Sequence, residues 1–117
     1  MAKINIPFND WSKEKLALGT KACTSRSQKY GNAGDEFFVE LPAKDSRGND
    51  TKKFQRYELL GVVKLPLSYI FYNLYEAEGA SDSDELMNVW GGIHPRFEYE
   101  KDRDKGYFVH FFKEVNE

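Results

Sequence analysis

Two strand-like segments joined by a polar stretch restrict the fold of this chain more than any other feature of its sequence. Residues 36–41 read EFFVEL, and residues 54–65 form a longer apolar run interrupted at Gly61, where we expect a β-bulge. The stretch 42–53 between them is rich in charged residues, Gly and Asn, which is typical of a hairpin loop. The pattern therefore predicts an antiparallel hairpin within a β-sheet.

The rest of the chain divides into short elements at turn and capping residues. Ile4, Ile6 and Phe8 alternate with polar positions, which predicts a strand that carries them on one face. A side-chain oxygen at Asn9 or Asp10 can accept a free backbone N–H, and a left-handed glycine commonly ends a helix. The expected elements are a strand over 3–8, a helix over 11–18 ended by Gly19, an extended or irregular segment over 20–26, a turn over 30–35, a short helix or turn over 68–75, a loop over 76–80, a helix from Ser81 or Ser83 to Trp90 ended by Gly91 and Gly92, a loop or distorted strand over 97–105, and a last strand over 106–115.

This order of elements predicts an α+β fold. Strands predominate and follow one another in sequence, which favours a small, mostly antiparallel β-barrel flanked by two or three short helices. Closing the barrel would also leave no strand edge exposed. The length of 117 residues, without a change in composition along the chain, predicts a single domain over residues 1–117.

The composition excludes several classes of protein. The chain has 2 Trp, 7 Tyr and 9 Phe residues, enough large apolar side chains to bury a core. It has no apolar run of the ~18 residues that a membrane helix needs, and its first residues lack the apolar centre of a signal peptide. We therefore expect a cytoplasmic protein without membrane contact. Cys23 has no second cysteine to pair with, so no internal disulfide is expected. The chain has only two histidines, His94 and His110, and we expect neither a metal nor a cofactor.

The charges are distributed unevenly along the chain. The net charge of −2 does not by itself indicate nucleic-acid binding. Residues 1–64 carry 12 Lys and Arg against 8 Asp and Glu, a net charge of +4, whereas residues 65–117 carry 5 against 11, a net charge of −6. We expect one end of the fold to be locally positive, with a mixed, solvated surface as the simpler interpretation.

The segment that carries most information about function is residues 19–26, which read GTKACTSR and follow the expected end of the first helix. A turn at Gly34 and Asp35 and a strand come next. This pattern resembles the ASCH domain, a small β-barrel family related in fold to the PUA domain, in which a G-x-K-x-x-T-x-R motif precedes a G-D turn and a strand. The residues on the motif positions are Gly19, Lys21, Thr24 and Arg26.

A second and looser similarity to the ASCH domain lies in the later half of the chain. The family often has a glutamate-rich loop before a helix that contains a tryptophan. Glu76, Glu78 and Gly79 match that loop, and Trp90 lies in the expected helix after it. The resemblance thus implies a PUA-like β-barrel for nearly the whole chain.

The resemblance also implies a function and a set of site residues. Some small bacterial ASCH proteins are identified as amidohydrolases that remove the acetyl group from N(4)-acetylcytidine. By resemblance, Lys21, Thr24 and Glu78 would be catalytic, with Glu76 as the competitor of Glu78 for the third position. Arg26 would hold the site together or contact a polar or phosphate group. The implied function is recognition of a nucleoside or RNA base, with hydrolysis of an acetyl amide as its sharper form.

The expected partner is a modified nucleoside or a single-stranded RNA, bound by a monomer. The predicted binding residues are Arg26, Lys29, Tyr30 and Glu76, and a tyrosine ring can stack on a base. Other ASCH proteins are identified as RNA-binding modules, so the alternative is a non-catalytic module with a regulatory or RNA-processing role. Ribonuclease activity is a third alternative that no motif favours.

Elementary chemistry leaves the roles within the site open. A threonine hydroxyl such as that of Thr24 needs a base before it can attack. Lys21 acts as that base only where burial or a neighbouring cation, such as Arg26, favours its neutral form. Glu78 could instead be the base, with Lys21 as a charged donor to the developing oxyanion.

Strand geometry adds a requirement to this hypothesis. Lys21 and Thr24 are separated by an odd number of residues, so in a regular strand they point to opposite faces. Both reach one cavity only if residues 20–24 form a turn or bulge. The plain structural alternative is a surface lysine at position 21 and an ion pair of Arg26 with Asp35 or Glu36.

Overall fold

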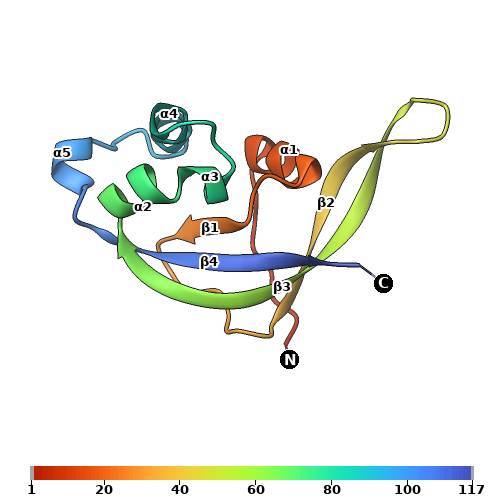
Figure 1. Ribbon diagram of the computed structural model, residues 1–117, viewed down its shortest axis with the longest axis horizontal. Helices are drawn as coiled ribbons and strands as arrows, with labels where there is room; N and C mark the ends of the chain where they lie inside the picture. Colours follow the sequence, from red (N-terminus) through yellow and green to blue (C-terminus); the bar gives the residue numbers. More distant parts are fainter. Residues whose placement is uncertain (1, 117) are drawn as a thin grey trace.

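The computed structural model describes residues 2–116, which form a curved β-sheet with helices lying over one side of it (Figure 1). The predicted α+β fold is confirmed, but the described residues form five helices rather than two or three, because two single-turn helices occupy expected loops. The elements in chain order are α1 (Asp10–Leu18), β1 (Cys23–Arg26), β2 (Glu36–Lys44), β3 (Asp50–Pro66), α2 (Leu67–Asn73), α3 (Tyr75–Glu78), α4 (Ser83–Ile93), α5 (Tyr99–Asp102) and β4 (Gly106–Val115).

The four strands form one antiparallel sheet in the order β1-β4-β3-β2. The 17-residue strand β3 pairs first with β2 and then with β4, and it curves strongly between the two (Figure 1). A register shift between Leu59 and Gly61 marks the predicted bulge, and a bulge increases the local bend of a strand. The sheet is therefore curled into a half-barrel, with β1 and β2 at its edges.

The half-barrel is not closed by the first residues of the chain. The expected strand over 3–8 is wrong, since only Lys3 makes an isolated bridge, to Glu36. The alternation of Ile4, Ile6 and Phe8 instead reflects packing, because these side chains lie against the core beneath α1 without forming a ladder of backbone hydrogen bonds.

The hairpin of β2 and β3 continues well into the stretch 42–53 that its composition predicts to be a loop. Pairing extends to Lys44 opposite Asp50, so the turn occupies only residues 45–49. The Asp45 carboxylate accepts two backbone N–H groups of this turn, both at 2.9 Å. The outer part of the hairpin projects from the body of the protein, so its strands are polar because solvent surrounds them (Figure 1).

The ends of α1 agree with prediction. Asn9 accepts the backbone N–H of Ser12 at its N-terminus, and Gly19 ends it with a left-handed φ of 77°. The helix α4 begins at Ser83, which is one of the two predicted starts, and Asp82 caps it. Its other end differs from prediction, because Gly91 and Gly92 continue the helix to Ile93 rather than ending it. A glycine ends a helix through a left-handed conformation, which neither of these two glycines adopts.

Two predicted loops contain single-turn helices. Residues 76–80 overlap α3, and residues 97–105 contain α5. Both segments are rich in acidic residues and too short to show a helical period, so sequence patterning favours a loop. The short helix or turn expected over 68–75 is confirmed as α2.

The buried side chains form two clusters. The first lies beneath α1. In it the ring of Phe37 stacks on that of Tyr57, with 5.3 Å between the ring centroids, and meets the ring of Phe112 edge-on, with 5.5 Å between the centroids. The second lies beneath α2, α3 and α4, around Phe71 and Trp90. The first cluster comprises Ile6, Leu16, Phe37, Val39, Leu41, Tyr57, Leu59 and Phe112. The second comprises Cys23, Leu67, Ile70, Phe71, Ala80, Leu86, Trp90 and Val109.

Replacement of the buried Phe37 should destabilise the protein more than replacement of the exposed Phe38. Phe37 is fully buried, whereas the next residue, Phe38, is 47% exposed on the opposite face of β2. Phe37→Ala is expected to lower the free energy of unfolding by about 3–5 kcal/mol. Phe38→Ala is the matched control and should lose far less. Urea denaturation measures both, and equal losses would contradict the assigned register of β2.

Candidate functional site

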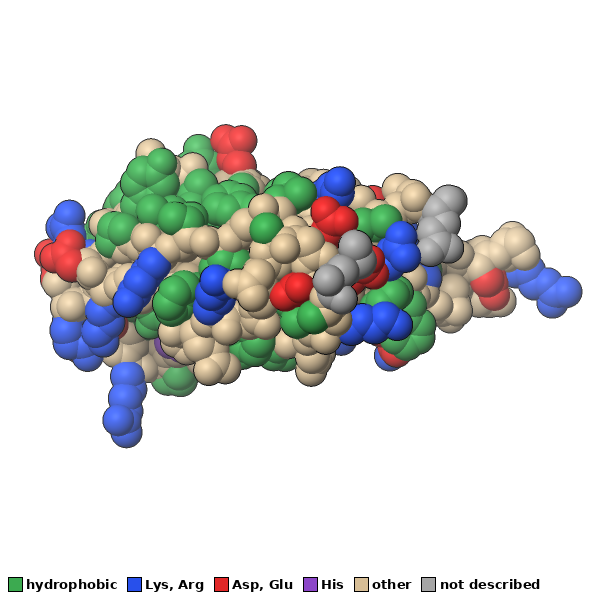
Figure 2. All heavy atoms as spheres, turned by 90° about the horizontal axis from the view of Figure 1, so that it is seen from below, with side chains coloured by type: hydrophobic (Ala, Val, Ile, Leu, Met, Phe, Trp, Pro, Cys, Tyr) green, Lys and Arg blue, Asp and Glu red, His purple; other side chains and the backbone are tan. Residues whose placement is uncertain are grey.

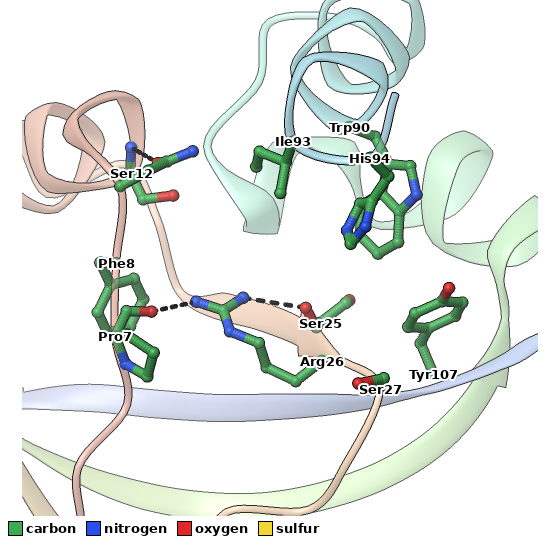
Figure 3. Close-up of a pocket in the computed structure, with 11 residues that line it drawn as sticks. Pro7, Phe8, Ser12, Ser25, Arg26, Ser27, Trp90, Ile93, His94 and Tyr107 are labelled. Carbon is green, nitrogen blue, oxygen red and sulfur yellow. Dashed lines mark hydrogen bonds between the residues drawn. The ribbon is translucent and has the colours of Figure 1, made fainter. Parts of the chain in front are cut away.

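A cleft of about 400 Å³ opens between the start of α1, the end of β1 and the end of α4 (Figure 3). Residues 7–12 and 25–27 supply most of its polar groups. Trp90, His94 and Tyr107 form an aromatic wall opposite them (Figure 3). The cleft therefore joins segments that are far apart in the sequence.

Arg26, the last residue of β1, extends its guanidinium across the floor of the cleft toward Pro7 and Phe8 (Figure 3). Its Nη2 donates to the carbonyl of Pro7 at 2.6 Å, and its Nη1 donates to the carbonyl of Ser25 at 2.9 Å and to the hydroxyl of Thr24. Burial lowers the pKa of Arg26, but a guanidinium keeps its charge in proteins. Arg26 is thus a fixed cation that lines the cleft.

The aromatic wall is formed by three rings in contact. The ring centroids of Trp90 and His94 lie 4.7 Å apart. The ring of Tyr107 meets that of Trp90 edge-on, with 5.0 Å between the centroids. Partial burial lowers the pKa of His94, and the charge of Arg26 lowers it further. His94 is therefore neutral at pH 7 and offers both a hydrogen-bond donor and an acceptor.

Behind the cleft lies a buried ion pair between Lys21 and Glu78. The ammonium Nζ donates to Glu78 Oε1 at 3.1 Å and to the Glu78 carbonyl at 2.8 Å. The two side chains are 2% and 5% exposed. The ammonium also lies 5.8 Å from the centroid of the Trp11 ring, which provides a cation–π contact. The pair is stable in this site because both charges are neutralised and hydrogen-bonded.

Local backbone structure brings Lys21 and Glu78 together. The backbone N–H of Ala22 donates to the carbonyl of Ala77 at 2.6 Å, which ties the approach to β1 to helix α3. Gly79 then ends α3 with a left-handed φ of 105°. A side chain at Gly79 would lie within 2.9 Å of Lys15 and 3.3 Å of Lys21, so glycine is needed for both conformation and space.

Ser25 connects the ion pair to the cleft. Its hydroxyl donates to Glu78 Oε2 at 2.6 Å, and the same residue lines the cleft beside Arg26 (Figure 3). Each oxygen of the Glu78 carboxylate thus has a different partner, Lys21 on one side and Ser25 on the other. The three residues form one hydrogen-bonded chain that reaches the floor of the cleft.

Thr24 is placed apart from this chain. It is 1% exposed, pairs across the sheet with His110, and its hydroxyl accepts from Arg26. The irregular segment required before the strand does exist, since β1 begins only at Cys23, but it turns Lys21 toward Glu78 and not toward Thr24. Thr24 therefore contacts the cleft through Arg26.

The remaining predicted residues lie outside the cleft. Lys29 is exposed, and Tyr30 is half-buried with its ring 5.8 Å from that of His110. Glu76 is exposed on a different surface, beside Lys15 and Thr20. Of the two glutamates considered for the site, Glu78 is the one bonded to Lys21.

His110 has a structural position beneath the segment that leads to Tyr30. Its Nε2 accepts the backbone N–H of Tyr30 at 3.0 Å, and its Nδ1 lies 2.9 Å from the carbonyl of Phe108. These two bonds together require a neutral ring with the proton on Nδ1. Burial lowers the pKa of His110 below its ordinary value of 6.5, consistent with this state.

Other chemistries find no support among the described residues. Cys23 is fully buried, and burial raises the pKa of its thiol, so it stays protonated and does not act as a nucleophile. Residues 2–116 contain no cluster of three His, Cys, Asp or Glu side chains that could hold a metal ion. No helix in the same range is long and apolar enough to cross a membrane.

Comparisons with known proteins bear on the fold. No family model matches the sequence, and no curated protein matches it. The chain is similar to the crystal structure of an ASCH domain from Lactobacillus crispatus JV V101, with a TM-score of 0.60 and 14% identity over 97% of this chain and 78% of that one. This chain has the fold of an ASCH domain. A DUF984 protein from Enterococcus faecalis V583 is also similar, with a TM-score of 0.57 and 15% identity over the same shares.

The ASCH fold expected from the motif is therefore confirmed, although the sequence resemblance to these two structures is low. Sequence reasoning missed several residues of the cleft, above all Ser25, His94 and Tyr107. The odd spacing of Lys21 and Thr24 was the signal that could have pointed to Ser25, since neighbouring strand residues face opposite sides. No pattern in the sequence indicates that the end of α4 lies close to β1.

Removal of one partner of the ion pair should be costly. Lys21→Met leaves the Glu78 carboxylate buried without a counter-charge, so the free energy of unfolding should fall by about 3–5 kcal/mol. The double variant Lys21→Met, Glu78→Leu should recover part of this loss. Urea denaturation of the wild type, both single variants and the double variant measures the coupling, with exposed Lys29→Met as control. Additive losses would contradict a direct interaction.

His110 should make the protein less stable in mild acid. Its pKa is lower in the folded chain than in the unfolded one, so the unfolded chain binds the proton first as the pH falls. The free energy of unfolding should be fully retained above pH 6.5 and decrease below it. In His110→Gln this decrease should be smaller, and His94→Gln should act in the same direction, because the pKa of each histidine is lowered in the folded chain. Thermal unfolding between pH 5 and pH 8 tests this, and identical curves for His110→Gln and wild type would contradict it.

Proposed function

We propose that this protein recognises a nucleoside or an RNA base in the cleft between α1, β1 and α4. The observation that carries this proposal is the position of Arg26, a fixed cation that lines the same cleft as the rings of Trp90, His94 and Tyr107. A planar base has a face that can lie against aromatic rings and edge oxygens that accept from a guanidinium. A cleft of about 400 Å³ is of the size that small-molecule sites have.

The ASCH fold supports the same conclusion, because the family resemblance implies nucleoside or RNA recognition. The charge distribution favours a single base, rather than a long RNA strand, as the ligand. On the face drawn in Figure 2, Lys and Arg side chains are interspersed with acidic and apolar side chains along the molecule and form no continuous band. A strand-binding surface needs a continuous basic groove along the backbone.

Calorimetry with cytidine, and with short single-stranded RNA, tests this proposal. Arg26→Gln should weaken binding by about 10-fold or more, because charged hydrogen bonds contribute about 1.5–3 kcal/mol. Exposed Arg96→Gln, which lies outside the cleft, is the matched control and should bind as the wild type does. Thermal unfolding of each variant confirms that it is folded. Absence of binding by the wild type to either ligand would refute the proposal.

The salt dependence distinguishes a base from a strand as the ligand. Recognition of one base in the cleft should give an affinity that changes little between low and high salt. Recognition of an RNA strand should give an affinity that falls steeply, because phosphate contacts release counterions. A steep slope would favour the non-catalytic RNA-binding alternative.

Hydrolysis of the acetyl amide of N(4)-acetylcytidine is a second candidate function. The observation that favours it is the chain of Lys21, Glu78 and Ser25, in which a carboxylate and an ammonium lie behind the hydroxyl that lines the cleft. Incubation with N(4)-acetylcytidine should release cytidine and acetate, detected by chromatography. Absence of release by the wild type would exclude this activity and leave the binding function standing.

A further inference from the structure

We propose that Ser25 is a nucleophile in the cleft and that Glu78 is the base that takes its proton, so that the site performs acyl transfer on an amide or ester carried by its ligand. This inference deepens the proposed function and rests on it, because the cleft that binds the ligand must bring its acyl carbonyl to Ser25.

The hydrogen bond between Ser25 and Glu78 is the first argument. The separation of 2.6 Å between Ser25 Oγ and Glu78 Oε2 is within the range of charge-assisted O–H···O⁻ bonds. A serine hydroxyl is a weak nucleophile until a neighbouring base accepts its proton, and Glu78 is already in contact with that proton. Ser25 is 4% exposed and lines the cleft, so the cleft is the side from which a ligand would meet it.

Lys21 supplies the orienting partner that such a pair requires. Its ammonium bonds both the carbonyl and Oε1 of Glu78, which fixes the carboxylate and leaves Oε2 directed at Ser25. The arrangement of nucleophile, base and orienting group is the general form of an activated nucleophile. Lys21 acts through Glu78, so it is a positioning residue and need not touch the ligand.

The neighbouring hydroxyls do not share this environment. Thr24 is on the opposite face of β1, is 1% exposed, and accepts a hydrogen bond from Arg26. Ser27 lines the same cleft and is exposed, but Ser25 is the serine that bonds Glu78. Ser25 thus has a carboxylate partner that neither Thr24 nor Ser27 is shown to have.

Arg26 is placed to stabilise the charge that develops during attack. Its bonds to Pro7, Ser25 and Thr24 occupy three N–H groups, and a guanidinium has about five. The cation lines the cleft beside Ser25. A preorganised cation next to the attacked carbonyl lowers the energy of the oxyanion.

The reaction balances without any further reactant than water. Ser25 Oγ forms a bond to the acyl carbon as Glu78 takes its proton, and the oxyanion then collapses as the carbon–nitrogen or carbon–oxygen bond breaks. The proton passes from Glu78 to the leaving amine or alcohol. Water then attacks the Ser25 ester, which releases the carboxylic acid and restores the hydroxyl.

The test uses p-nitrophenyl acetate as a probe. Its acetyl group transfers readily, and the p-nitrophenolate that leaves is detected by its absorbance. The wild type should gain one acetyl group on the peptide that contains Ser25, detected by mass spectrometry after rapid acid quenching. Ser25→Ala should lose this adduct, whereas Ser46→Ala, in the exposed turn between β2 and β3 and outside the cleft, should retain it. Glu78→Gln should acetylate at least about 100-fold more slowly, the contribution typical of a general base.

Ser25→Cys keeps the inference testable should a Glu78 variant fail to fold. Its thiol should be acetylated at the same position, and thermal unfolding should match the wild type because the change is small. No adduct on wild-type Ser25, an adduct mapped to Ser27 instead, or an adduct that survives Ser25→Ala would overturn the inference.

Calorimetry reports nucleoside binding, and mass spectrometry reports acetylation of Ser25, so the two measurements can disagree. Ser25→Ala should still bind cytidine in calorimetry, because Arg26 and the aromatic wall remain in place. A wild type that binds cytidine but forms no acetyl adduct would retain the recognition function and lose the nucleophile. A wild type that is acetylated on Ser25 but binds no nucleoside would retain the nucleophile and require a different ligand.

Discussion

The arrangement of the site depends on one buried ion pair, between Lys21 and Glu78. It joins the segment before β1 to helix α3, which are separated by more than fifty residues of chain. Isolated charges are expensive to bury, so the pair persists only because each group has several partners. Those partners include Ser25, and through it the pair reaches the cleft. An interaction within the core therefore also orients a polar group at the surface.

Strand alternation decides which hydroxyl this pair can reach. Thr24 and Ser25 are neighbours in β1, and neighbouring strand residues point to opposite faces. Thr24 lies against His110 and bonds Arg26, whereas Ser25 bonds Glu78 and lines the cleft itself. The two residues thus have separate tasks, Thr24 holding the guanidinium and Ser25 meeting the carboxylate.

The curled sheet explains why the cleft lies where it does. The bulge near Gly61 bends β3, so that helices α1 and α4 approach one another above the sheet (Figure 1). The end of β1 lies beneath the space between them (Figure 3). The cleft is therefore a consequence of the fold as well as of its residues.

The sequence by itself determined the strand β4, the inner parts of β2 and β3, and the helix α1 with its two caps, because local periodicity and turn residues carry that information. The ASCH fold was implied by the resemblance of residues 19–26 to the family motif. It also identified Lys21, Arg26 and Glu78 as polar residues of interest. Only the tertiary structure decided that Lys21 pairs with Glu78, that Ser25 rather than Thr24 faces the cleft, and that His94 and Tyr107 complete its wall. These are contacts between distant segments. They depend on the curvature of the sheet and the packing of the helices, which no local pattern of residues records.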